Sequence, residues 1–155
     1  MPPLIALTAV TVLALIARRP PLLALRLGIA AMFVVTGAAH FIGMREELIA
    51  MVPPWLPAPE LLVTITGALE LAGAVGVVLP ATAPWAAAGL GTLLVAMFPA
   101  NVHLALTNPD LPFTQQLVPR TVIQLIFLAA TTTVVVAYAR TRRSASTDAA
   151  DLIAR

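Results

Sequence analysis

Six polar side chains stand out because they lie inside or beside long apolar stretches: Glu70, His40, His103, Asn101, Arg120 and Gln124. A carboxylate at the centre of a membrane helix costs about 2.5 to 3.5 kcal/mol unless it faces protein or water. Carboxylates and imidazoles in such positions can take up and release protons. We therefore expect Glu70 and His103 to be catalytic, and we expect a ligand to be bound by His40, Asn101, Arg120 and Gln124.

Glu70 lies within residues 61–79, which are otherwise free of ionisable groups. Nineteen helical residues span about 29 Å, close to the hydrocarbon thickness of a bilayer. At about 100° per residue, Glu70 shares a helix face with small residues, including Gly67, Gly73 and Ala74. Small residues let membrane helices approach closely, so this face should turn toward the other helices. Glu70 is then either part of a site or a structural polar contact.

The chain is 60% apolar and 10% charged, which predicts an integral membrane protein of one domain. Further apolar runs cover residues 22–42, 86–106 and 120–139. The sequence thus predicts an all-α membrane protein, a four-helix transmembrane bundle over residues 22–139. An additional N-terminal hydrophobic helix, residues 1–17, would be a short span or signal anchor, and residues 140–155 a polar tail that is disordered from 144 to 150.

Two features interrupt the helical pattern. Residues 45–51 should form a short helix at the membrane surface, and the prolines of residues 52–59 forbid regular helix after it. This proline-rich segment is either a stiff interfacial loop or a lid over a pocket. Pro99 should kink the helix that carries Asn101 and His103.

The composition excludes several classes of chemistry and sets an orientation. Without cysteine, the chain has no disulfide, thiolate nucleophile or Cys-ligated metal. With the N-terminus outside, seven of the nine arginines fall on the cytoplasmic side, which fits the positive-inside rule for the bacterial inner membrane. The basic charge therefore indicates topology and no nucleic-acid partner. Arg26, near a helix end, is expected to extend to the membrane interface.

In this topology the six polar groups converge on the outer half of the bundle. Each also has a structural explanation, such as an interfacial His40, a helix–helix hydrogen bond from Gln124 or an Asn101 cap beside Pro99. An ion pair between Glu70 and Arg120 requires the long arginine side chain to extend from the outer end of its helix toward the bundle centre. His103 or Gln124 could otherwise connect the two by hydrogen bonds. His40 and His103 meet the minimum for bis-histidine haem ligation, but His40 lies too near its helix end, and we expect no metal.

Four segments carry a resemblance to a known family. GAAHF (37–41), MVPPWLP (51–57), GALELAGAVGVVLP (67–80) and VAMFPANVHLAL (95–106) occur in this order. Together they resemble the DoxX-like family of small membrane proteins over residues 22–138. The resemblance implies a four-helix membrane bundle. Its founding members are similar to a subunit of a thiosulfate:quinone oxidoreductase, and others are linked to redox complexes or to maturation of partner proteins.

Two functions fit these observations. The first is a subunit of a quinone-linked membrane oxidoreductase system, in which Glu70 or His103 handles the proton and Arg120 or Asn101 polarises a quinone carbonyl. Quinone is the one cofactor that this hypothesis names. The alternative is a non-enzymatic assembly or accessory protein for a partner complex. Partners are then the lipid bilayer and a redox protein or membrane complex, and whether the chain is an enzyme or a homo-oligomer stays open.

Overall fold

The computed structural model describes residues 1–108 and 110–153, with side chains as far as residue 147. The described residues form α-helices and one 3₁₀ turn, with no strand. Their order is α1 (Pro2–Ile16), α2 (Pro21–Ala39), α3 (Arg45–Met51), α4 (Pro59–Val78), α5 (Ala83–Thr107), η1 (Phe113–Gln115) and α6 (Leu117–Ile153).

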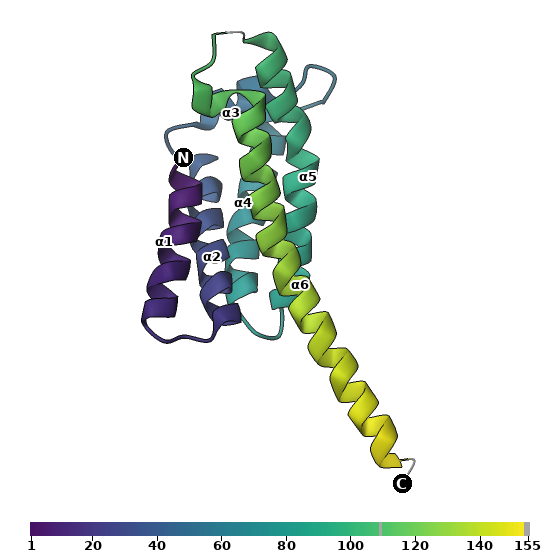
Figure 1. Ribbon diagram of the computed structural model, residues 1–155. Coiled ribbons are helices and arrows are strands. Elements are labelled where there is room, and N and C mark those ends of the chain that lie inside the picture. Colours follow the sequence, from purple (N-terminus) through teal and green to yellow (C-terminus); the bar gives the residue numbers. More distant parts are fainter. Residues whose placement is uncertain (109, 154–155) are drawn as a thin grey trace.

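Helices α2, α4, α5 and α6 form the bundle, and α1 packs against the outside of α2 (Figure 1). Large apolar side chains fill the centre, among them Ile29, Phe33, Leu90 and Val134, each at most 2% exposed. Many other large apolar side chains point outward, as expected for helices whose outer faces meet lipid.

The predicted fold class is confirmed. Four helices are long and apolar enough to cross a membrane, and α1 is a shorter apolar helix of 15 residues. At about 22 Å, α1 is shorter than a bilayer core of about 30 Å. It lies close to α2 because Gly28 has no side chain: a Cβ there would lie 2.6 Å from the Leu7 carbonyl oxygen.

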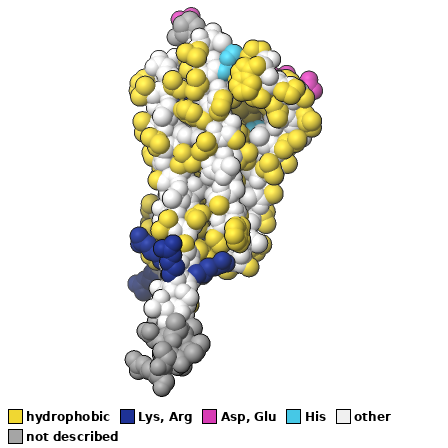
Figure 2. Space-filling model, turned by 90° about the vertical axis from the view of Figure 1, so that its right-hand side faces the viewer, with side chains coloured by type: hydrophobic (Ala, Val, Ile, Leu, Met, Phe, Trp, Pro, Cys, Tyr) yellow, Lys and Arg dark blue, Asp and Glu magenta, His cyan; other side chains and the backbone are white. Residues whose placement is uncertain are grey.

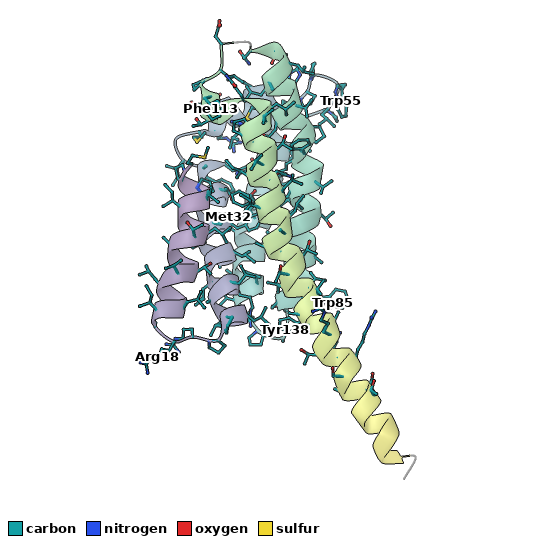
Figure 3. All side chains as sticks on the ribbon, viewed as in Figure 1. Arg18, Met32, Trp55, Trp85, Phe113 and Tyr138 are labelled. Carbon is teal, nitrogen blue, oxygen red and sulfur yellow. The ribbon has the colours of Figure 1, made fainter. Side chains whose placement is uncertain are left out.

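The two ends of the bundle differ in their charged residues, and each carries aromatic side chains (Figure 3). Trp55 and Phe113 lie at the end that bears α3 and η1, here called the α3 end, and Trp85 and Tyr138 lie at the other. Such pairs of aromatic levels are typical of membrane interfaces. Basic side chains gather at the second end (Figure 2), here called the arginine end. By their place in the chain its arginines are Arg18 and Arg19, between α1 and α2, and Arg140, Arg142 and Arg143, which follow Tyr138 on α6.

Short segments were predicted with mixed success. The helix Arg45–Met51 is confirmed, and the proline-rich segment after it is not helical, although Pro59 already belongs to α4. Helix α5 is helical on both sides of Pro99, and the kink expected there stays a prediction. The prediction of disorder over residues 144–150 is wrong, since α6 continues to Ile153. After Pro119 the sequence has no glycine or proline that would end this helix. Arg155, which was counted toward the cytoplasmic charge, lies outside the described residues.

Candidate functional site at the crossing of helices α2 and α4

Helices α2 and α4 meet through two glycines that face two polar residues. A Cβ at Gly67 of α4 would lie 2.5 Å from the His40 Cβ, and a Cβ at Gly37 of α2 would lie 3.2 Å from the Glu70 Cβ. His40 of α2 therefore packs against Gly67 of α4, and Glu70 of α4 packs against Gly37 of α2. On each helix the glycine lies three residues before the polar residue. The two glycines are what allow His40 and Glu70 to lie together inside the bundle.

His40 caps the C-terminus of α2 and is 7% exposed. Its Nδ1 lies 2.9 Å from the carbonyl oxygen of Thr36, one turn earlier. Because a carbonyl only accepts, Nδ1 carries a hydrogen and donates it. In the neutral imidazole, which burial favours, Nε2 is then an acceptor.

Glu70 is 2% exposed, and its Oε2 is a buried oxygen without a hydrogen-bond partner among the described residues. The nearest cationic or ionisable nitrogen is His40 Nδ1, 3.9 Å from Oε2. This distance is too long for a hydrogen bond, and the Nδ1 hydrogen is already donated to Thr36. Buried polar groups are nearly always paired, so an unpaired carboxyl oxygen marks a place where a proton, a water or a ligand can be accepted.

Arg45 connects this pair to the surface at the α3 end. Its Nη1 donates to the carbonyl of His40 at 3.1 Å, and its Nη2 donates to the Thr64 hydroxyl at 2.9 Å and to the Glu60 carbonyl at 3.3 Å. The guanidinium thus joins the end of α2 to the first turns of α4. It covers the crossing with a fixed positive charge.

The remaining predicted site residues form a separate contact between α5 and α6. Arg120 donates from Nη1 to Asn101 Oδ1, and Gln124 donates from Nε2 to the backbone carbonyl of Leu94. A Glu70–Arg120 ion pair, which would require the arginine to extend inward, is not found among the described residues, and Arg120 bonds instead to Asn101 on its neighbouring helix. The interpretation of Gln124 as a helix–helix hydrogen bond is confirmed.

His103 does not join either group. Its side chain is partly buried on α5, and no hydrogen bond of its ring is found among the described residues. The structure therefore divides the six predicted residues into the pair Glu70–His40, the α5–α6 contact and a separate His103. The proposed meeting of all six in one pocket is not seen.

Sequence reasoning missed three contributors. Thr36 accepts from His40 one turn away, Arg45 covers the crossing, and Gly37 lets Glu70 approach α2. The repeated spacing of a glycine three residues before a polar residue, Gly37 to His40 and Gly67 to Glu70, was a signal that could have identified the crossing.

Arg26 is the clearest correction, because it does not extend to the interface. It is 5% exposed; Nε donates to the Val77 carbonyl at 2.8 Å, Nη1 to the Tyr138 hydroxyl at 3.0 Å, and Nη2 to the Val78 carbonyl. The last carbonyls of a helix lack partners of their own, and a cation is favourable there. Arg26 therefore caps α4 from inside the bundle and joins it to α6.

Comparison with protein families identifies one match. The model of the family described as "Domain of unknown function (DUF8561)" matches residues 29–135, more than half of the chain. No curated protein matches significantly, and no solved structure does. The matched range includes Gly37, His40, Gly67 and Glu70. It begins after Arg26 and ends before Tyr138.

Proposed function

Since the chain belongs to the DUF8561 family, whose description assigns no function, we propose one from its geometry. The protein is a DoxX-like integral membrane protein in which the Glu70–His40 pair binds and releases a proton. It serves a quinone-linked membrane oxidoreductase system. The observation that carries this proposal is the buried Glu70 Oε2, which has no hydrogen-bond partner among the described residues and lies 3.9 Å from His40 Nδ1.

The pair has the parts that proton exchange needs. Glu70 can hold a proton in the dry interior, and the neutral His40 ring has one acceptor nitrogen. A small rotation of the ring would transfer the Nδ1 hydrogen bond from Thr36 to Glu70. Reduction of a quinone consumes two electrons and two protons. This chain would contribute protons, and the electrons would come from a redox partner protein.

The orientation belongs to the same proposal. The arginine end would face the cytoplasm, by the positive-inside rule, and the α3 end would face outward. His40 and Glu70 would then exchange protons with the outer side of the cytoplasmic membrane, past Arg45. A reporter fused after Arg143 should be active only in its cytoplasmic form, and activity of a periplasmic reporter there would reverse the orientation.

A second candidate is a non-enzymatic assembly or accessory protein. The observation in its favour is the α5–α6 contact, where Arg120, Asn101 and Gln124 satisfy one another or the backbone. Polar groups satisfied in this way hold helices together. The two functions separate at Glu70, because only the first requires this residue to ionise.

The deciding experiment compares Glu70→Gln with Glu60→Gln. Both changes remove one carboxylate from α4, but Glu60 is exposed at the first turn. Lipid extracts of the purified proteins are analysed by mass spectrometry for quinone. Binding of an added short-chain ubiquinone is titrated in weakly buffered solution, so that the protons exchanged on binding are measured together with the affinity. We expect wild type and Glu60→Gln to bind quinone with proton exchange, and Glu70→Gln to fold without the exchange.

Two further variants complete the test. His40→Gln keeps a hydrogen-bonding side chain against Gly67 and should lose the exchange like Glu70→Gln. His103→Ala should keep it, since His103 lies outside the pair. Normal quinone binding and proton exchange in Glu70→Gln would contradict the proton-carrying role and favour the function of an accessory protein.

A further inference from the structure

A groove on the outer surface of α6 ends at an arginine. It is an open, shallow hollow of about 320 Å³ on the face of this one helix, lined by Thr132, Thr133, Val136, Ala137 and Arg140. The spacing of these residues by three, four, seven and eight positions places them on one helix face. The lower end of the groove is thus cationic, while the rest offers methyl groups and hydroxyls.

The groove continues toward α5. A second groove, of about 300 Å³, runs between α5 and α6 and shares Thr132 with the first. It is lined on the α5 side by small residues, including Ala88 and Gly91. Neither groove is lined by Glu70 or His40, so this surface is separate from the proton site.

Arg140 lies at the arginine end of the bundle, where a membrane headgroup would be. Trp85, 70% exposed at the start of α5, marks that level beside α6 (Figure 3). Arg18, Arg19, Arg142 and Arg143 add positive charge there (Figure 2). The one ion pair found among the side chains of residues 1–147 joins His40 and Glu70, so none of the carboxylates of these residues lies within 4.0 Å of these arginines.

We propose that the groove on α6 binds an anionic phospholipid, with its phosphate on Arg140 and an acyl chain along Thr133 and Val136. Guanidinium groups bind phosphate oxygens in a bidentate manner. Basic residues that flank a membrane helix attract anionic lipids. The groove carries its cation at the headgroup level and its apolar lining where the chain would lie, so the two parts of the site match the two parts of one lipid.

The test uses the full-length protein in detergent, to which phosphatidylglycerol or phosphatidylcholine is added while the melting temperature is followed. Arg140→Gln is compared with Arg142→Gln, which removes the same charge two residues later, on the opposite side of α6. We expect phosphatidylglycerol to stabilise wild type more than phosphatidylcholine does. Its apparent affinity should fall about tenfold in Arg140→Gln, through loss of a charge-assisted contact, and less than about threefold in Arg142→Gln.

A second variant tests the acyl-chain part. Thr133→Phe fills the exposed groove without touching the core and should weaken phosphatidylglycerol binding with Arg140 still present. Native mass spectrometry of the purified protein should show phosphatidylglycerol retained by wild type and lost from both groove variants. Equal losses of phosphatidylglycerol affinity in Arg140→Gln and Arg142→Gln would show that the surface charge attracts the lipid without a defined site. Equal stabilisation by phosphatidylglycerol and phosphatidylcholine would also overturn the proposal. So would the finding that the groove retains a quinone.

Discussion

Two buried ionisable side chains on neighbouring helices, Arg26 and Glu70, have opposite surroundings. Arg26 donates from each of its three nitrogens, to two carbonyls and a phenol, and the Tyr138 ring lies 5.9 Å from the guanidinium carbon. Glu70 is as well buried, yet its Oε2 has no partner. A satisfied charge holds elements together, whereas an unsatisfied one weakens the fold and is retained only where it does something else.

The two residues also differ in what surrounds them. Arg26 reaches the carbonyl end of α4, where a cation is favourable without any carboxylate. Glu70 lies about 16 Å along α4, in the interior of the helix, and its polar neighbours on α2 are Thr36 and His40. Arg26 therefore has the contacts of a stabilising residue and Glu70 does not, and stability measurements can test this difference.

The largest effect should come from Arg26→Ala. The change leaves two C-terminal carbonyls of α4 and the Tyr138 hydroxyl without their donor, and it opens a cavity. We expect the free energy of unfolding to fall by about 3 kcal/mol, measured by denaturant or thermal unfolding in detergent. Arg19→Ala, at an exposed position, is the control and should change little. A loss below about 1 kcal/mol would mean that Arg26 does not hold α4 to α6.

Gly67→Ala should cost less, about 2 kcal/mol. The added Cβ would meet the His40 Cβ and the ring of Phe41, so α2 and α4 must separate. Gly89→Ala is a matched control, because a Cβ at Gly89 in α5 meets nothing within 4 Å. The control should be neutral or more stable by up to about 1 kcal/mol, from helix propensity alone. If both variants behave alike, the close crossing at His40 is not a constraint.

Tyr138→Phe should lower the free energy of unfolding by about 1 kcal/mol, since it removes one hydrogen bond to Arg26 and keeps the ring. A double-mutant cycle with Arg26→Ala isolates their coupling. The effect of Tyr138→Phe should vanish in the Arg26→Ala background, and an undiminished effect there would contradict the contact.

The smallest effect at these two sites, and of opposite sign, should come from Glu70→Met. An apolar side chain of similar volume removes a buried oxygen that has no partner, so we expect the free energy of unfolding to stay level or rise by up to about 1 kcal/mol. Thermal unfolding in detergent measures it, alongside the proton-exchange assay, which Glu70→Met should abolish. If Glu70→Met lowered the free energy of unfolding as much as Arg26→Ala does, Glu70 would stabilise the fold as Arg26 does.

The sequence predicted the helices better than their contacts. Apolar runs of membrane length and the prolines at their ends are local signals, and they predicted the four-helix bundle and the short helix Arg45–Met51. The predicted topology placed the six polar residues in the same half of the bundle. The position of a residue along the membrane normal, however, does not predict which helices are neighbours. Glu70 was therefore considered as a partner of Arg120, whereas Arg120 bonds to Asn101 on the adjacent helix. The prediction for Arg26 was wrong because the sequence shows only that this arginine lies near a helix end. At that place an arginine can extend to the membrane interface or cap a neighbouring helix, and the sequence does not distinguish the two.

Helix α6 is unbroken over 37 residues, about 55 Å, from Leu117 to Ile153. Near one end it carries Arg120, bonded to Asn101, and near the middle Tyr138, bonded to Arg26. Its last turns extend beyond the bundle (Figure 1). Arg26 bonds both to Tyr138 of α6 and to the last carbonyls of α4, so α6 is connected through one guanidinium to the helix that carries Glu70. A shift of α6 at the level of Tyr138 would therefore also displace the end of α4.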